Sequence, residues 1–173
     1  GDQTTIAIPF NNGDSSKLGK IVTDDYFGKV PAERLKVGSQ LMLMKADANF
    51  RSKVGISPKR AKPFVGSYDA KNNVLTIAFF SLPEGENKYV NSLWKIQEDP
   101  YSGDAVNAYN DGPINGKQMG KFYEIESSSP AAGLGPGESL KHTHTTIHLK
   151  GERIYLDKIA KHVFGVSLHE LIF

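Results

Sequence analysis

The stretch FVGSYDAKNNVLTIAFFSLPEGENKYVNSLWKIQ, residues 64–97, decides the fold that we expect. It contains three extended, mostly apolar runs separated by DAKNN and PEGEN. Asp, Asn, Gly and Pro are the residues that tight turns favour. Extended runs joined by short turns are typical of consecutive antiparallel strands. The stretch therefore predicts a three-stranded meander over 64–68, 74–82 and 89–97.

Further extended runs lie on both sides of the meander. We expect strands at 4–10, 40–46 and 50–57, and two alternating runs at 122–128 and 142–149. After Gly151 the apolar residues follow helical spacing, and Gly165 is a suitable stop for a helix. We therefore predict an all-β fold, an antiparallel β-sandwich, in which a short helical tail at 152–173 packs on the sheet.

The composition is that of an ordinary globular protein, with 39% hydrophobic and 23% charged residues. A chain of 173 residues can bury a core without cross-links, so we expect a single domain over 1–173. The net charge is +2, and no basic cluster is interleaved with aromatic residues, which argues against a nucleic-acid partner. The absence of cysteine excludes disulfides and thiolate chemistry. No run approaches the ~20 apolar residues of a membrane span.

Carboxylates and imidazoles gather on the runs at 122–128 and 142–149. Side chains alternate between the faces of a strand, so Glu124 and Glu126 share one face, and His142, His144 and His148 share another. The simplest interpretation is the ordinary polar face of a sheet in a non-catalytic structural β-domain. The alternative is a metal-dependent enzyme that uses the three histidines with one of the glutamates, because these ligands suit iron, manganese or zinc. His-x-His on a strand resembles the start of the cupin metal site, although the glutamate that cupins place soon afterwards is absent.

A third interpretation comes from a resemblance. Ile125-Glu126-Ser127, then Pro136-Gly137-Glu138 and a threonine-rich strand, resemble the C-terminal strands of the galactose mutarotase, or aldose epimerase, family. The segment from Lys53 through WKIQEDPYSGDAVNAYNDGP to the helical tail also looks like an uncharacterised group of bacterial proteins related to that superfamily.

The resemblance implies a mutarotase-like sandwich that binds a sugar and interconverts its anomers, with Glu126 as the catalytic base. It also implies a periplasmic or extracellular location. The family's general acid is a histidine upstream of the glutamate, whereas every histidine here stands at 142 or later. The family's sandwich is also larger than this chain. We therefore expect the chain to be the C-terminal part of a longer protein, or a reduced relative that binds its sugar without turnover.

The candidate ligand-binding residues supply stacking and hydrogen bonds. Trp94 offers an aromatic face for a sugar ring, and amide and carboxylate side chains match the paired donors and acceptors of a sugar. The polar loop at 98–120 provides most of these groups, since binding residues concentrate on exposed loops. The predicted set is Trp94, Gln97, Asn107, Asn110, Asp111, Arg60, His142 and His144. We expect a small-molecule sugar or sugar derivative as the partner, with no cofactor and no membrane.

Overall fold

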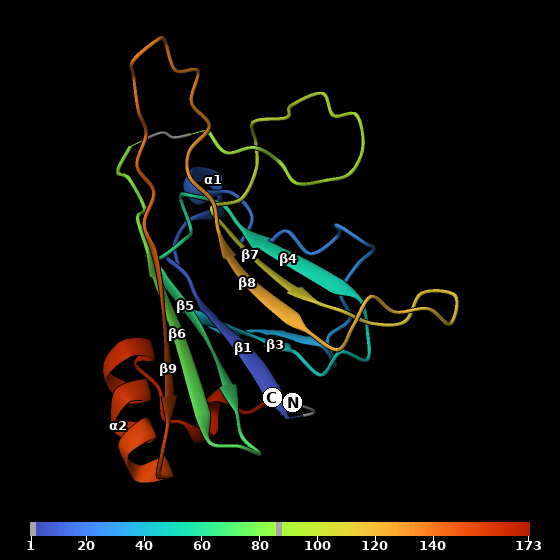
Figure 1. Cartoon of the computed structure of the whole chain (residues 1–173), viewed down its shortest axis with the longest axis vertical. Coiled ribbons are helices and arrows are strands. Elements are labelled where there is room, and N and C mark those ends of the chain that lie inside the picture. The colour runs from blue at the N-terminus through green and yellow to red at the C-terminus, as the bar shows by residue number, and fades with distance from the viewer. Residues whose placement is uncertain (1–2, 86–87) are drawn as a thin grey trace.

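The structure of the protein is a computed structural model that describes residues 3–85 and 88–173. Nine strands in these residues form two antiparallel sheets (Figure 1). The large sheet contains, in spatial order, β2 (Leu35–Val37), β3 (Leu41–Lys45), β1 (Thr4–Pro9), β5 (Phe64–Asp69), β6 (Val74–Phe80) and β9 (His144–Lys150). The small sheet contains β4 (Ser52–Ile56), β7 (Val106–Asn110) and β8 (Tyr123–Ser127). The predicted all-β sandwich is confirmed.

The main core lies between the two sheets. Alternate residues of β1, such as Ile6 and Ile8, point toward the small sheet. Met42 and Met44 of β3 belong to the same core and are fully buried. Ala7 points to the opposite face, which is also covered. Every residue of strand β1 is therefore buried, because both faces of the strand are covered.

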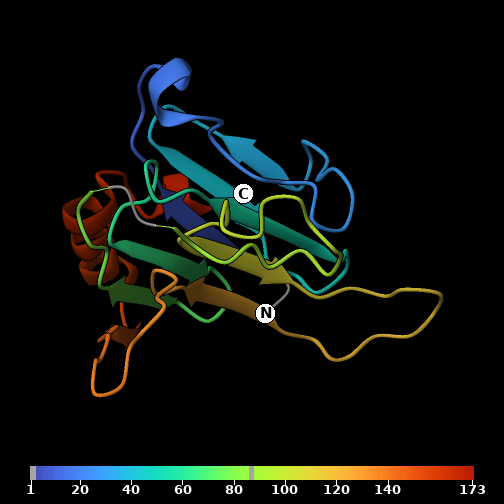
Figure 2. The same ribbon diagram turned by 90° about the horizontal axis from the view of Figure 1, so that it is seen from above.

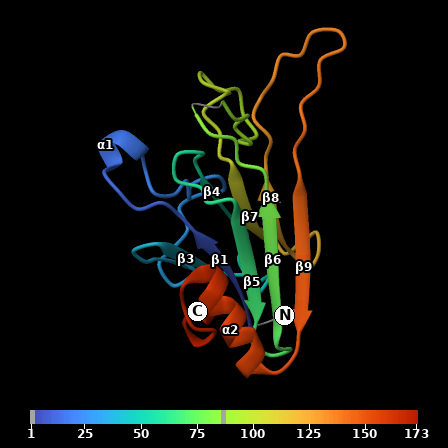
Figure 3. The ribbon, with the colours of Figure 1, turned by 90° about the vertical axis from the view of Figure 1, so that its left-hand side faces the viewer.

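The helix α2 (Arg153–Phe164) covers the face of the large sheet that points away from the small sheet (Figure 3). Its buried side chains are Leu156, Ala160 and Phe164, which recur at helical spacing. The helix ends at Gly165, where φ is 74°, a left-handed conformation that glycine adopts without a Cβ penalty. The short helix η1 (His169–Leu171) follows and packs against the same sheet face. No helix in the described residues is long and apolar enough to cross a membrane.

Long connections project from the sandwich. The segments 88–105 and 128–143 extend from one end (Figure 1), and the loop at 111–122 extends from the other end of the small sheet (Figure 2). A fourth connection, the loop at 11–19, carries the one-turn helix α1 (Ser15–Leu18). The segment 20–30 then passes along the edge of β4 that faces away from β7, where Thr23 exchanges backbone hydrogen bonds with Gly55 at 2.7 and 2.8 Å.

Two predictions about the strands are wrong. Residues 89–97 form an irregular loop, in which the Gln97 amide donates to the carbonyls of Asn91 and Leu93 at 3.1 and 3.0 Å. The apolar side chains that suggested a strand, Trp94 and Ile96, are exposed there. Conversely, β7 lies in the segment predicted as a polar loop. Glu86 and Asn87 of the predicted PEGEN turn lie outside the described residues.

Candidate functional site

The outer face of the small sheet gathers polar side chains from all three of its strands. Antiparallel pairing places Lys53 opposite Tyr109 and Asn107 opposite Glu126, with Glu124 on the far side of Tyr109. These five residues share one face, because the residues between them point into the core. We call this surface the outer face.

Glu126 forms an ion pair with Lys53 on the outer face. The Lys53 Nζ atom lies 3.5 Å from Oε1 and 3.4 Å from Oε2 of the carboxylate. The lysine side chain is only 13% exposed and the glutamate 36%, so the pair is partly shielded from water. Lys53 also lies 5.6 Å from the centre of the Tyr26 ring, a cation–π contact. The arrangement holds the Glu126 carboxylate in place while part of it remains open to a ligand.

Tyr26 and Asp104 form a buried hydrogen-bonded unit beside this pair. The Tyr26 hydroxyl donates to Oδ2 of Asp104 at 2.6 Å, and Nδ2 of Asn107 lies 3.2 Å from the same hydroxyl. Burial raises the pKa of Asp104, and burial together with the Asp104 charge raises the pKa of Tyr26. The phenol therefore keeps its proton at neutral pH. Gly55 makes room for the unit, since a Cβ there would lie 2.0 Å from Oδ2 of Asp104.

Glu124 and Glu126 form an adjacent carboxyl pair on β8. Partial burial raises the pKa of Glu124, and the neighbouring carboxylate of Glu126 raises it further. Lys53 acts in the opposite direction, as a smaller effect. Two carboxyl groups in such different surroundings can divide their roles, with Glu124 holding a proton more readily while Glu126 pairs with the lysine.

Aromatic rings border the outer face. Trp94 is 85% exposed and meets Phe27 edge-on at 6.3 Å between ring centres, and Phe27 meets Tyr109 at 6.0 Å. The guanidinium of Arg51 lies over the Phe27 ring at 3.9 Å. The exposed indole is thus connected through Phe27 to the strand that carries Asn107.

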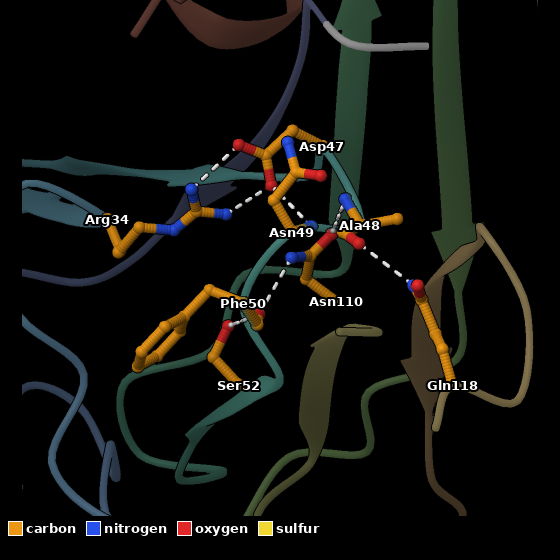
Figure 4. A network of polar contacts seen from close by, with 8 residues as sticks. All are labelled: Arg34, Asp47, Ala48, Asn49, Phe50, Ser52, Asn110 and Gln118. Atoms are coloured by element: carbon orange, nitrogen blue, oxygen red, sulfur yellow. Dashed lines mark hydrogen bonds and ion pairs between the residues drawn. The ribbon is translucent and has the colours of Figure 1, made fainter. Parts of the chain in front are cut away.

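Two predicted ligand-binding residues are corrected by the structure, because both are fully buried and bonded within the protein. Asn110 points into the core, where its amide accepts from the backbone N–H of Ala48 at 2.9 Å and donates to the carbonyl of Phe50 at 2.9 Å (Figure 4). Arg60 donates to three carbonyls and one hydroxyl in the loop at 11–19. Both side chains fasten loops to the sandwich.

Asp111 and Gln97 are also committed to local structure. Asp111 is 1% exposed and accepts from the Tyr109 hydroxyl at 2.7 Å and from the Gly120 N–H at 3.0 Å. Gln97 uses its amide N–H groups within the loop at 89–97. Asn107 lies next to Glu126 but is 3% exposed, and its amide donates to the Val54 carbonyl at 3.3 Å, so it is corrected from a ligand contact to a buried support of the face. Of the predicted site, Glu126 and the exposed Trp94 at the aromatic border remain accessible.

The histidines lie on the other side of β8. Ser127 points away from Glu126, and its hydroxyl lies 2.9 Å from Nε2 of His142 and 2.7 Å from Nδ1 of His144. His148 contacts Thr76 instead, at 2.9 Å. His148 stands four positions after His144 on an extended strand, about 13 Å away, which is too far for one metal ion. In the described residues no three His, Cys, Asp or Glu side chains gather as metal ligands.

Several residues on the outer face or next to it were not predicted as ligands. Lys53, Tyr26 and Asp104 come from three distant segments, and no local motif marks any of them. The one available signal was the polar alternation of SKVG before a buried strand, which places Lys53 on the outer side.

Comparison with known proteins identifies the family of the chain. The model of a family of unknown function, DUF6786, matches residues 1–172. The chain belongs to the DUF6786 family. No curated protein and no solved structure gives a significant match. The function of this DUF6786 protein therefore has to be inferred from its own residues.

Proposed function

We propose that the outer face of the small sheet binds a saccharide, with Glu126 accepting a hydrogen bond from the anomeric hydroxyl. The observation that carries the proposal is the position of Glu126. Its side chain is 36% exposed and lies beside the Lys53 amine, next to the buried Asn107 of β7, and Trp94 stands at the aromatic border of the same face. A sugar ring requires both donors and acceptors at its edge and an apolar surface for its C–H face.

The two carboxyl groups of β8 extend the proposal to a reaction. Interconversion of anomers needs a base that takes the proton of the anomeric hydroxyl and an acid that protonates the ring oxygen, so that the bond between C1 and the ring oxygen breaks. The open-chain aldehyde rotates, and ring closure returns both protons. Glu126 serves as the base and Glu124, with its raised pKa, as the acid. Such groups typically contribute ~100- to 10,000-fold each.

This assignment departs from the resemblance to galactose mutarotase in one respect. The family's acid is a histidine upstream of the glutamate, and this chain has none there. Glu124 stands two residues before Glu126 on the same face and provides an alternative source of the proton. A periplasmic or extracellular location belongs to the same proposal and is testable by cell fractionation.

Fluorescence titration tests sugar binding, because Trp94 is the sole tryptophan and lies at the border of the outer face. We expect saturable changes in its emission with an aldohexose or a hexuronic acid, and a weaker response in Glu126→Gln. Glu152→Gln is the matched control, since Glu152 is exposed and makes no side-chain capping bond. Unchanged emission across glucose, galactose and their uronic acids would remove the proposal.

Magnetisation exchange between anomeric protons tests turnover in the same samples. We expect exchange faster than the uncatalysed rate in the wild type, and a fall toward that rate in Glu124→Gln and Glu126→Gln. Saturable binding without faster exchange would leave a sugar-binding protein and exclude the acid and base roles.

A further inference from the structure

A pocket of about 430 Å³ opens beside the outer face. It lies between the loop that carries α1 and the residues that lead into β7. Its volume falls within the range of small-molecule sites. Among the residues that line it are Lys17, Lys20, Ser57, Lys59, Ser102 and Asp104.

The charge of the pocket favours an anion. Three lysines and one aspartate line it, and the aspartate already accepts the Tyr26 hydrogen bond at 2.6 Å. In the described part of the chain, neither Lys17 nor Lys20 is within 4.0 Å of a carboxylate oxygen. A hollow lined mainly by one sign of charge concentrates ligands of the opposite sign.

Hydrogen bonds connect the pocket to the outer face. Asp104 lines the pocket, and through Tyr26 it is bonded to the unit that includes Asn107. Asn107 in turn is paired with Glu126 across β7 and β8. The wall on the α1 side is fixed, because Arg60 holds the loop at 11–19 by four hydrogen bonds.

We propose that the pocket binds the anionic group of a saccharide whose ring lies on the outer face. The ligand class is an acidic sugar, one that carries a carboxylate, a sulfate or a phosphate. This inference rests on the proposed function and names its substrate class. Lys17 and Lys20, which line the pocket, recognise the negative charge of that group.

Comparison of the affinities for charged and neutral sugars tests the inference. Trp94 fluorescence is followed at low ionic strength with glucose, glucuronate, glucose 6-sulfate and glucose 6-phosphate. We expect at least one acidic sugar to bind about tenfold more tightly than glucose, since each exposed ion pair adds a modest attraction that salt screens. All three acidic sugars carry the anionic group at the C6 end of the same ring, so the order of their affinities shows which anion the pocket prefers.

A charge-reversed variant and a matched control locate the effect. Lys17→Glu/Lys20→Glu is expected to remove the advantage of the acidic sugar and to leave glucose affinity unchanged. Lys71→Glu/Lys141→Glu changes the net charge equally at exposed sites outside the pocket and should keep the advantage. Equal affinities for glucose and for all three acidic sugars in the wild type would overturn the inference.

Amide NMR separates this inference from the proposed function. Inorganic phosphate and sulfate, added alone, are expected to shift the backbone amides of Gly19, Ser57 and Gly103 in the wild type and in Glu126→Gln, but not in the Lys17→Glu/Lys20→Glu variant. Absence of these shifts would overturn the pocket assignment even where glucose binds. Shifts with either anion, together with no response to any sugar, would overturn the saccharide assignment and leave an anion site.

Discussion

Replacement of Gly55 with alanine tests whether the Tyr26–Asp104 unit determines the geometry of the outer face. The new Cβ would lie 2.0 Å from Oδ2 and 2.6 Å from Cγ of Asp104, and 2.8 Å from Nδ2 of Asn107. Ordinary contacts require more than 3.4 Å. The carboxylate must therefore move by more than an ångström, which breaks the 2.6 Å hydrogen bond from Tyr26.

The magnitude follows from two costs. Overpacking of a filled site costs about 1–3 kcal/mol, and a lost hydrogen bond to a charged group costs about 1.5–3 kcal/mol. We expect a destabilisation of about 3 kcal/mol, which corresponds to about 6–12 °C in melting temperature for a chain of this size. Because Asn107 moves with Asp104, the response of Trp94 to sugar should also weaken.

Urea denaturation and sugar titration of the same samples measure both effects. Gly151→Ala is the control, because no atom lies within 4 Å of its added Cβ. In Gly55→Ala/Asp104→Ala the methyl group takes the space of the carboxylate, so the double variant should be about as stable as Asp104→Ala alone. If Gly55→Ala unfolds at the same urea concentration as the wild type, the crowding at this site is not what the structure implies.

Three further predictions concern the stability of the sandwich and the border of the site. Hydrogen bonds from Arg34 lower the pKa of Asp47 from 3.8 to about 2, so the ionised aspartate adds about 2 kcal/mol of stability above pH 4. This stability should disappear as the pH falls from 4 through 2, and urea midpoints of Asp47→Asn should lack that dependence. Leu156→Ala, in the buried side of α2, should cost about 2–5 kcal/mol in thermal unfolding, whereas Ile154→Ala, 61% exposed, should cost under about 0.5 kcal/mol. Trp94→Ala should keep the wild-type melting temperature and weaken the binding of sugar measured by calorimetry, since the indole is 85% exposed and meets Phe27 edge-on.

Strands with a local hydrophobic pattern could be predicted from the sequence. The runs at 4–10 and 40–46 are strands because their apolar residues meet the core directly. Residues 89–97 have a similar pattern but pair with no named strand of the described residues; Tyr89 reaches the core, whereas Val90, Trp94 and Ile96 are exposed. Strand formation depends on a partner that local pattern does not reveal.

Strand β7 was missed for the opposite reason. Its residues VNAYN are rich in asparagine, which favours turns. The strand is nevertheless buried throughout, because Asn107 and Asn110 find hydrogen-bond partners in distant segments. Buried amides are tolerated only where such partners exist.

The site was partly predictable. The alternation around Glu126 placed Glu124 and Glu126 on one face, and the register of β8 agrees. The partners of that face could not be predicted, since Lys53 stands 73 residues before Glu126 and Tyr26 stands 78 residues before Asp104. Contacts over such separations are made by the fold and leave no local pattern in the sequence.

The burial of Arg60 has a consequence for the loop at 11–19. No side chain of that loop is buried, so apolar packing does not fix its position. A single planar guanidinium, with donors on two of its nitrogens, holds four points along the loop at once. Lysine has one compact ammonium group and cannot span the same points. The motion of this surface segment should therefore depend more on the chemistry of one interior cation than on the residues of the segment itself.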